Sequence, residues 1–264
     1  MRSVFTKAIV RPPAANFSKG LTTAGLGSPD YRRALQQHAA YCAALENCGV
    51  QLIRLEAEEQ YPDSCFVEDA ALIVGSVPYG QSAIITRPGA LSRRGEIETI
   101  RSLLKDFFPA ICEIQPPGTL DGGDICEAST HVFIGISERT NEDGGKQLGE
   151  ILATRGFTHT LVDTDGIPGL LHLKSGLAYL GKNNLVVTEA LARRHDFPGY
   201  DLICVRPGDE YAANCIEVNG RALIAAGYPD LEAKLSKLGY ETIALEMSEF
   251  RKMDGGLSCL SLRW

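Results

Sequence analysis

The stretch SAIITRPGALSRRGEIETIRSLLKDFFPAICEIQPPGTLDGGDICEA, residues 82–128, contains one complete copy of the pattern that decides the fold. It begins with SAIITRPG, a short apolar segment that is rich in β-branched residues and ends at Pro-Gly, as buried strands do. A segment with helical spacing follows at about 92–108, and then a second apolar strand, AICEIQPP. A polar loop, LDGGD, and a further short strand close the copy. The stretch therefore predicts a strand–helix–strand unit with a polar loop behind it.

The same order of segments occurs five times along the chain, and no linker or low-complexity segment separates the copies. The other four copies are AIVRPP, a helix at 29–47 and GVQLIRL; HVFIGISERT, a helix at 145–154 and GFTHTLVD; NNLVVTEA, a short helix and GYDLICVRP; and ALIAAGYP, a helix at 229–238 and GYETIALE.

Polar side chains gather at one position of every unit, in the loop that follows the second strand. The five loops are PDSCFVED, LDGGD, HLKSG, AANC and DGGLSC, and they recur roughly every 40–55 residues. If the units close into a ring, these loops meet in a central cavity, and the last strand of the chain is tied into the ring. The pattern alone leaves a second arrangement open, in which the βαβ units form one doubly wound parallel sheet.

Composition and charge exclude several classes of function. A chain of 264 residues with 44% hydrophobic residues can bury a large core, and a net charge of −7 argues against nucleic acid and anionic membranes as partners. No stretch of 18 apolar residues is present, and the segment MRSVFTKAIVRPP lacks the features of a signal peptide. The eight cysteines include no C-x-x-C pair, so we expect reduced thiols in a cytoplasmic protein.

Cys259 is the cysteine with the most specific surroundings, because DGG precedes it closely and an apolar segment follows it. A nucleophilic cysteine needs a partner that transfers protons, and imidazole titrates near neutral pH. His172, in the loop HLKSG, is the best candidate for this partner, whereas His38 and His195 are predicted on the surface. The alternative for His172 is a buried structural histidine.

Acidic residues mark two of the polar loops. Glu68 and Asp69 directly precede an apolar strand, and Asp121 and Asp124 flank a Gly-Gly pair. A buried carboxylate needs a partner, and a planar guanidinium can pair with two carboxylates at once. A calcium or magnesium loop at DGGD is a weaker alternative.

Two arginines follow first strands at equivalent places, Arg87 in ITRPG and Arg139 in SERTNEDG. Either guanidinium could bind a carboxylate in bidentate fashion, although a single arginine is most often a surface residue.

Seven motifs, in order, resemble the dimethylarginine dimethylaminohydrolase family: PDSCFVED, ITRPG, TLDGGD, RTN, LHLKSG, YAANCI and DGGLSCLSL. The resemblance runs from residue 20 to the last strand, and it implies a single domain at 1–264 with the five-bladed α/β-propeller of the guanidine-modifying superfamily. It implies that Cys259 is the nucleophile, His172 the general acid and base, and Asp121 the third catalytic residue. The implied substrate-binding residues are Glu68, Asp69 and Asp121 for the guanidinium, Arg87 and Arg139 for the α-carboxylate, and Asp63 with the backbone of Leu21 and Met253 for the amino-acid end.

The implied reaction converts an Nω-methylated arginine to citrulline and an alkylamine through a covalent thiouronium on Cys259, with no metal and no organic cofactor. The implied partner is a small cationic substrate, and the resemblance is compatible with a homodimer. Two alternatives stay open, namely a deiminase that releases ammonia from arginine or another guanidine, and a binder of arginine-like amines without catalysis.

Overall fold

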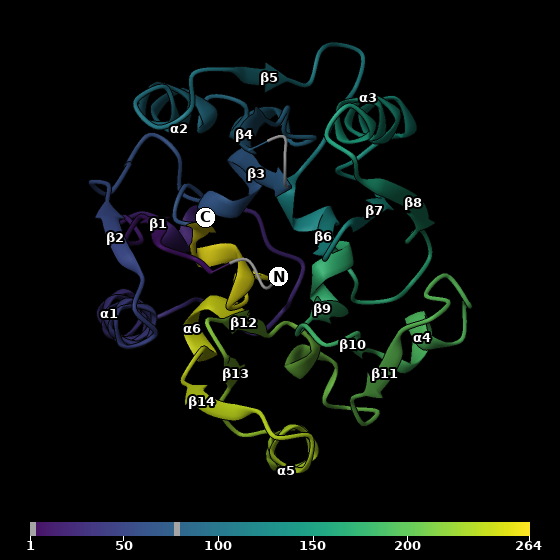
Figure 1. Cartoon of the computed structure of the whole chain (residues 1–264). Coiled ribbons are helices and arrows are strands. Elements are labelled where there is room, and N and C mark those ends of the chain that lie inside the picture. Colours follow the sequence, from purple (N-terminus) through teal and green to yellow (C-terminus); the bar gives the residue numbers. More distant parts are fainter. Residues whose placement is uncertain (1–3, 77–79) are drawn as a thin grey trace. The chain divides into compact units, whose positions relative to one another are not determined.

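The computed structural model describes residues 4–76 and 80–264 and divides into two compact units. The first unit combines Met1–Phe66 with Lys174–Trp264, and the second is Val67–Leu173. Each unit is built from three-stranded mixed sheets and from helices, most of which are labelled in Figure 1. The single domain predicted for residues 1–264 stays a prediction.

Three sheets belong to the first unit. Their strand orders are β15-β1-β2, β9-β10-β11 and β12-β13-β14. The strands are β1 (Lys7–Val10), β2 (Gln51–Arg54), β9 (Leu177–Tyr179), β10 (Asn184–Val187), β11 (Asp201–Cys204), β12 (Ile216–Val218), β13 (Arg221–Ala225), β14 (Glu241–Leu245) and β15 (Leu262–Arg263).

Two sheets belong to the second unit, with the orders β3-β4-β5 and β6-β7-β8. The strands are β3 (Ala71–Ser76), β4 (Gly80–Ile85), β5 (Ile111–Glu113), β6 (Ile125–Ala128), β7 (His131–Ile136) and β8 (Thr158–Asp163).

All five sheets have the same topology, which confirms the predicted repeat. In each sheet the middle strand pairs antiparallel with one neighbour and parallel with the other, as β7 does with β6 and β8. Parallel neighbours require a crossover connection, and the predicted helices supply it. The last strand, β15, pairs with β1, as predicted. Because the described strands form five separate sheets, the doubly wound alternative is wrong.

Two of the helices, α1 and α3, begin at a residue whose side chain caps the first turn. The Asp30 side chain accepts the N–H of Arg33 at the start of α1, and the Asn141 side chain accepts the N–H of Gly144 at the start of α3. The helices are α1 (Tyr31–Asn47), α2 (Ile97–Leu104), α3 (Glu142–Ala153), α4 (Glu189–Ala192), α5 (Pro229–Lys237) and α6 (Ser248–Arg251).

Each polar loop forms a short 3-10 turn immediately before the strand that follows it. These turns carry or adjoin the polar residues singled out above. Each of the five strand–helix–strand repeats therefore has polar side chains at the same position. The turns are η2 (Val67–Ala70), η4 (Gly122–Asp124), η5 (Leu173–Ser175), η6 (Glu210–Ala213) and η7 (Ser258–Leu260).

His38 lies inside α1 and is buried, so its predicted surface position is wrong. Its Nδ1 atom lies 3.7 Å from the sulfur of Cys42, one helical turn later. Burial, together with the charge of Arg54, lowers the pKa of His38 to about 4. The ring is therefore a neutral part of the core.

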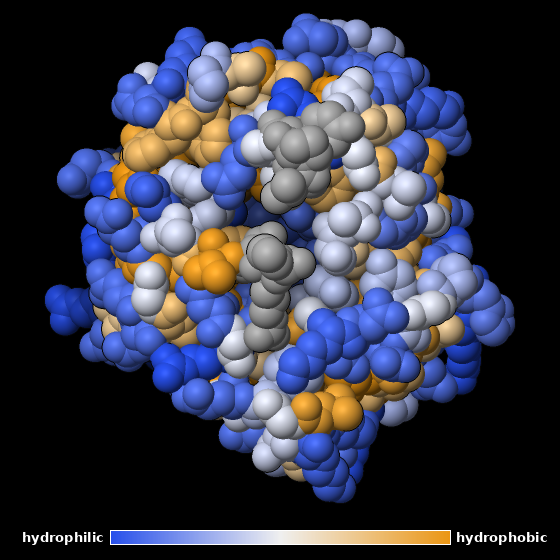
Figure 2. Space-filling model, in the orientation of Figure 1, coloured by the Kyte–Doolittle hydropathy of each residue, from blue (hydrophilic) through white to orange (hydrophobic). Residues whose placement is uncertain are grey.

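Apolar side chains that alternate along the strands build the cores. In the second unit, residues of β4, β7 and α3 pack together, with Ile84, Ile134 and Leu148 fully buried. Hydrophilic surface predominates on the face drawn in Figure 2, with hydrophobic residues scattered across it. Within the described residues, no helix is long and apolar enough to cross a membrane.

We predict that Leu148→Ala lowers the free energy of unfolding by ~2–5 kcal/mol, because it leaves a cavity between α3 and its sheet. Leu91→Ala is the control, since Leu91 is 75% exposed and its loss should change the free energy by less than about 0.5 kcal/mol. Urea unfolding of both variants checks this. Equal effects of the two changes would contradict the packing described for α3.

Candidate active site

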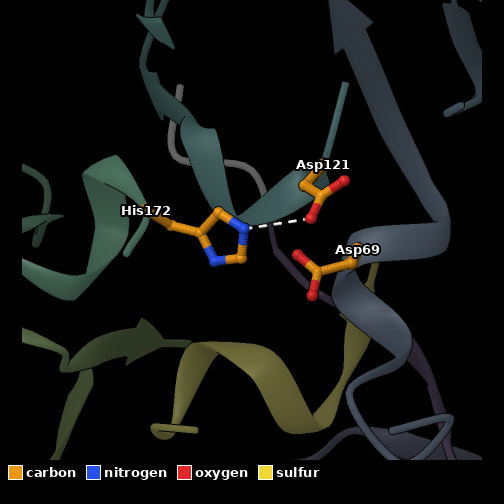
Figure 3. A group of neighbouring side chains, drawn as sticks. All are labelled: Asp69, Asp121 and His172. Carbon is orange, nitrogen blue, oxygen red and sulfur yellow. Dashed lines mark hydrogen bonds and ion pairs between the residues drawn. The ribbon is translucent and has the colours of Figure 1, made fainter. Parts of the chain in front are cut away.

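His172 and Asp121 form a buried hydrogen-bonded pair in the second unit. The Nε2 atom of His172 lies 3.1 Å from Oδ2 of Asp121, which is fully buried (Figure 3). The other oxygen of Asp121 accepts the N–H of Gly89 at 2.9 Å. Both oxygens of the carboxylate are therefore engaged, and this fixes the orientation of the imidazole.

Asp69 belongs to the turn η2, and its carboxylate lies beside the imidazole (Figure 3). Its Oδ1 atom accepts the N–H of Gly123 at 2.8 Å, and its Oδ2 atom lies 2.6 Å from Nη1 of Arg93. Arg93 also pairs with Glu96, with 2.7 Å between Nη2 and Oε2. Since Arg93, Asp69 and Glu96 are all buried, the site rests on a buried ionic network.

Asp124, at the end of η4, connects the backbone next to His172 with the segment at residues 137–140. Its Oδ1 accepts the N–H of Leu173, the residue after His172, at 2.9 Å. Its Oδ2 accepts the hydroxyls of Ser137 at 2.7 Å and Thr140 at 2.6 Å. Both carboxylate oxygens of Asp124 therefore accept hydrogen bonds from the protein, and these bonds stabilise the conformation of the DGGD loop.

The carboxylates keep His172 protonated. Burial alone would lower the pKa of His172, but the negative charges of Asp69, Asp124 and Asp121 outweigh burial and raise the pKa to about 9. Burial would raise the pKa of Asp69, yet Arg93 and His172 lower that pKa to about 2. At neutral pH the site therefore holds an imidazolium beside ionised carboxylates.

The Gly-Gly pair of DGGD lets these groups approach one another. A Cβ atom on Gly123 would lie 2.7 Å from Nδ1 of His172 and 2.9 Å from Oδ1 of Asp69. A Cβ atom on Gly122 would lie 2.0 Å from the carbonyl oxygen of Glu68. No side chain fits at either position, so both residues must be glycine for Asp69, His172 and the backbone of Glu68 to approach this closely.

Arg87 and Arg139 lie on neighbouring loops of the second unit, and both are half-buried. Nη1 of Arg87 donates to the carbonyl of Gly118 at 3.0 Å. A Cβ atom on Gly89, two residues after Arg87, would lie 2.3 Å from the carbonyl oxygen of Arg139. The two loops therefore pack backbone to backbone.

Cys259 lies in the first unit, on the turn η7, and is half-buried. Its sulfur accepts the N–H of Gly256 at 3.5 Å and lies 3.9 Å from the hydroxyl oxygen of Ser258. Strand β15 follows the turn and pairs with β1, so the thiol stands on a supported segment. None of the eight cysteines forms a disulfide in the structure.

Three residues predicted to bind the amino-acid end of a substrate meet in the first unit. The N–H of Leu21 donates to both oxygens of Asp63, at 3.1 and 3.0 Å. A Cβ atom on Gly20 would lie 2.2 Å from Oδ1 of Asp63 and 3.2 Å from Cε of Met253. The backbone at residues 20–21 therefore packs on Asp63 and Met253.

The predicted site residues are divided between the two units. The second unit holds Glu68, Asp69, Arg87, Asp121, Arg139 and His172, and the first holds Leu21, Asp63, Met253 and Cys259. Action of the residues of both units on one substrate stays a prediction.

Asp69, Asp121 and His172 offer ligand atoms within 4.8 Å of one another, the only such group among the described residues that could hold a metal ion. Two of these atoms are already committed to each other in the Asp121–His172 hydrogen bond, and Asp69 is paired with Arg93. An imidazolium cannot bind a metal until it loses its proton. The arrangement is therefore better suited to an organic cation with N–H donors than to a metal.

Arg93 and Glu96 were missed at the sequence level. The segment SRRGE held two signals for them, a basic and an acidic residue three positions apart, and a nearby buried acid that required a cation. The sequence alone does not distinguish Arg93 from the exposed arginines that form most arginine–glutamate pairs at this spacing.

Comparison with known proteins identifies the family, although no protein-family model matches the chain. The chain is 44% identical, over 99% of its length and 100% of the relative's, to N(G),N(G)-dimethylarginine dimethylaminohydrolase of Pseudomonas aeruginosa. It belongs to the dimethylarginine dimethylaminohydrolase family.

Solved structures of the family agree with this assignment. A cysteine-to-serine variant of the Pseudomonas aeruginosa enzyme, complexed with citrulline, superposes with a TM-score of 0.93 at 43% identity, covering 99% of this chain and 100% of that one. A histidine-to-glycine variant of a dimethylarginine dimethylaminohydrolase, in an adduct with S-methyl-L-thiocitrulline, gives 0.92 at 44% identity with the same coverage. Together with the five equivalent sheets, this likeness confirms the predicted pseudo-fivefold α/β-propeller.

We predict that Arg93→Met lowers the free energy of unfolding by ~3–5 kcal/mol, because it leaves the carboxylates of Asp69 and Glu96 buried without their cation. Arg193→Met is the control, since Arg193 pairs with Glu189 at the surface and its loss should cost less than about 1 kcal/mol. Urea unfolding of both variants checks the difference. Similar losses in the two variants would show that the buried network contributes little.

We also predict a pH dependence of stability that His172→Gln removes. The folded pKa of His172, about 9, lies above its ordinary value of 6.5, so the stabilisation is complete below pH 6.5 and is lost as the pH rises through 9. Relative to the variant, the wild-type protein should lose up to ~3 kcal/mol of unfolding free energy across that window. Chemical unfolding at a series of pH values measures it, and parallel curves for the two proteins would contradict the shift.

Proposed function

We propose that this protein hydrolyses Nω-methylated L-arginine, both asymmetric dimethylarginine and monomethylarginine, to L-citrulline and dimethylamine or methylamine. Full-length identity of 44% to a dimethylarginine dimethylaminohydrolase carries the proposal. The complex of a related cysteine-to-serine variant with citrulline supports the product.

In the proposed reaction the thiolate of Cys259 attacks the guanidinium carbon and forms a C–S bond. His172 gives a proton to the departing nitrogen, the C–N bond breaks, and the alkylamine leaves a thiouronium on sulfur. Neutral His172 then takes a proton from water, which attacks the same carbon. Breaking the C–S bond restores the thiolate, and the hydroxyl proton of the adduct passes through solvent to the released amine, which becomes an alkylammonium as citrulline forms. One water is consumed for each amine released.

The electrostatics of His172 support its role as the acid in the first half of this reaction. Burial opposes the charged ring, but Asp69, Asp124 and Asp121 together raise the pKa of His172 to about 9, so the imidazole carries its proton at neutral pH. Transfer of this proton to an amine leaving group needs a donor that is protonated before the substrate reacts. Asp121 keeps Nε2 in place and stabilises the imidazolium.

The remaining site residues are proposed to bind the substrate by charge. Asp69 and Asp121, with Glu68 beside them, supply negative charge for the guanidinium. Each carboxylate has about four lone-pair directions, so oxygens that already accept a bond from the chain can accept another from a substrate N–H.

The amino-acid end of the substrate is assigned to a second set of residues. Arg87 and Arg139 would bind the α-carboxylate, while Asp63 and the carbonyls of Leu21 and Met253 would accept from the α-ammonium. We expect the proposed hydrolysis to take place in the cytoplasm and the protein to bind neither nucleic acid nor membranes. A homodimer is compatible with the proposal.

We predict that Cys259→Ser lowers citrulline formation by at least about 10³-fold, because a serine hydroxyl is a far weaker nucleophile than a thiolate in this setting. Binding of dimethylarginine, measured by calorimetry, should change by less than about tenfold, because the carboxylates and arginines are untouched. Cys204→Ser, at an exposed cysteine, is the control and should retain full activity.

Amine analysis separates the proposal from its rivals. Dimethylamine should be released from dimethylarginine far faster than ammonia is released from arginine. Preferential release of ammonia would indicate a deiminase, and tight binding without any product would indicate a binder.

A further inference from the structure

The segment YAAN, residues 211–214, holds the backbone that leads to Cys259. It comprises the end of the turn η6 and Asn214 after it, and it belongs to the same unit as Cys259. Two of its side chains, those of Tyr211 and Asn214, reach the DGGLSC loop at different points. Neither has a role in the reaction proposed above.

Tyr211 binds the first half of this loop. Its hydroxyl lies 2.9 Å from the carbonyl oxygen of Gly255 and 3.5 Å from that of Met247. Burial, followed by the charge of the nearby Cys259, raises the pKa of Tyr211, so the hydroxyl keeps its proton and donates it. The guanidinium of Arg251 stacks on the ring, 5.0 Å from its centroid, and holds its orientation.

Asn214 binds the second half and is buried. Its Oδ1 accepts the N–H of Ser258 at 3.0 Å, and its Nδ2 donates to Oγ of Ser258 at 3.1 Å. The second hydrogen of Nδ2 reaches the carbonyl of Lys174, in the turn that follows His172 in sequence, at 2.9 Å. Both the oxygen and the nitrogen of the Asn214 carboxamide therefore form hydrogen bonds.

The contact between Asn214 and the loop leaves no spare room. A Cβ atom on Gly256 would lie 2.4 Å from both Cγ and Oδ1 of Asn214. The second glycine of the DGG motif is therefore explained by the carboxamide that packs against it. Gly256 is also the residue whose N–H points at the sulfur of Cys259, at 3.5 Å.

These bonds determine what the sulfur meets. Oγ of Ser258 accepts a hydrogen bond from Nδ2 of Asn214 and lies 3.9 Å from the sulfur of Cys259. A thiolate can only accept, so in that state of Cys259 the hydroxyl of Ser258 is the donor of this contact. The N–H of Gly256 and the hydroxyl of Ser258 are both donors that favour a thiolate over a thiol. Asn214 bonds to Ser258, which carries one donor, and packs against Gly256, which carries the other.

We propose that Tyr211 and Asn214 are positioning residues for the nucleophile, which clamp the Gly255–Ser258 backbone and direct two hydrogen-bond donors at the sulfur of Cys259. This inference rests on the proposed function, in which Cys259 attacks the substrate.

The test replaces Asn214 by Asp, which keeps the shape and the acceptor oxygen but replaces the two donors with a charged acceptor. We expect kcat for citrulline formation to fall about 10²-fold with KM for dimethylarginine changed by less than about threefold, because the thiol is misplaced while substrate binding is not. Alkylation of Cys259 by iodoacetamide, followed by mass spectrometry, should slow at least about fivefold, because the thiolate loses its donors. Tyr211→Phe should lower kcat less, by about 3–10-fold, because it removes a single donor.

Asn219→Asp is the matched control. The carboxamide of Asn219 also accepts one N–H, from Phe5 at 2.9 Å, and donates to two acceptors, the carbonyls of Phe5 at 2.8 Å and Cys48 at 2.9 Å. Loss of these bonds should cost similar stability in a thermal melt, with kcat and the alkylation rate unchanged.

A purely structural role for Asn214 would give the two Asp variants the same kcat and the same alkylation rate, and this result would overturn the clamp. If the wild-type protein forms no citrulline but the alkylation rates still differ between the two variants, the clamp stands and the proposed function fails.

Discussion

The structure around the candidate site depends on the cost of burying carboxylates. Asp69, Glu96, Asp121 and Asp124 are all buried in the second unit, and each would be unstable there without a partner. Two cations supply the compensation, the guanidinium of Arg93 and the imidazolium of His172. The carboxylates therefore keep His172 charged, and the charged imidazole in turn stabilises the buried carboxylates. A group that stabilises the fold in its protonated form is also the group that the proposed reaction needs as an acid.

Backbone shape makes this network possible. The DGGD turn places Asp121 and Asp124 on either side of two residues that have no side chain, and the imidazole and Asp69 occupy the space where side chains would be. A comparable arrangement is found in the first unit, where Gly256 lies against Asn214 and its neighbour Gly255 lies against Phe66. In both loops a Gly-Gly pair follows an acid, and in both the glycines allow a polar group to approach closely. The repeat supplies the same scaffold each time, a 3-10 turn ahead of an antiparallel strand.

Much of this could be predicted from the sequence, for identifiable reasons. The five repeats were predictable because β-branched segments, helical spacing and Gly or Pro breaks are local properties, and α1, α3 and α5 occur close to their predicted ranges. The burial of Glu68, Asp69 and Asp121 was predictable because these acids stand next to apolar strand residues, where solvent cannot satisfy them.

Long-range pairing was not predictable in this way. Arg93 reads as one of several arginines in a helical segment, and only the fold shows that its guanidinium faces Asp69. His38 was predicted on the surface because it lies in the first helix, yet its position on α1 places it in the core. The role of Asp124 was hidden because its partners Leu173, Ser137 and Thr140 lie on three other segments.

The ionisation of His172 is the central claim, and nuclear magnetic resonance of the imidazole nitrogens tests it most directly. Recorded from about pH 5 to 10 on protein labelled at histidine, the His172 resonances should show both nitrogens protonated at pH 7 and should titrate with a midpoint near 9, above the ordinary value of 6.5. A neutral ring at pH 7, with a midpoint at or below 6.5, would contradict the account.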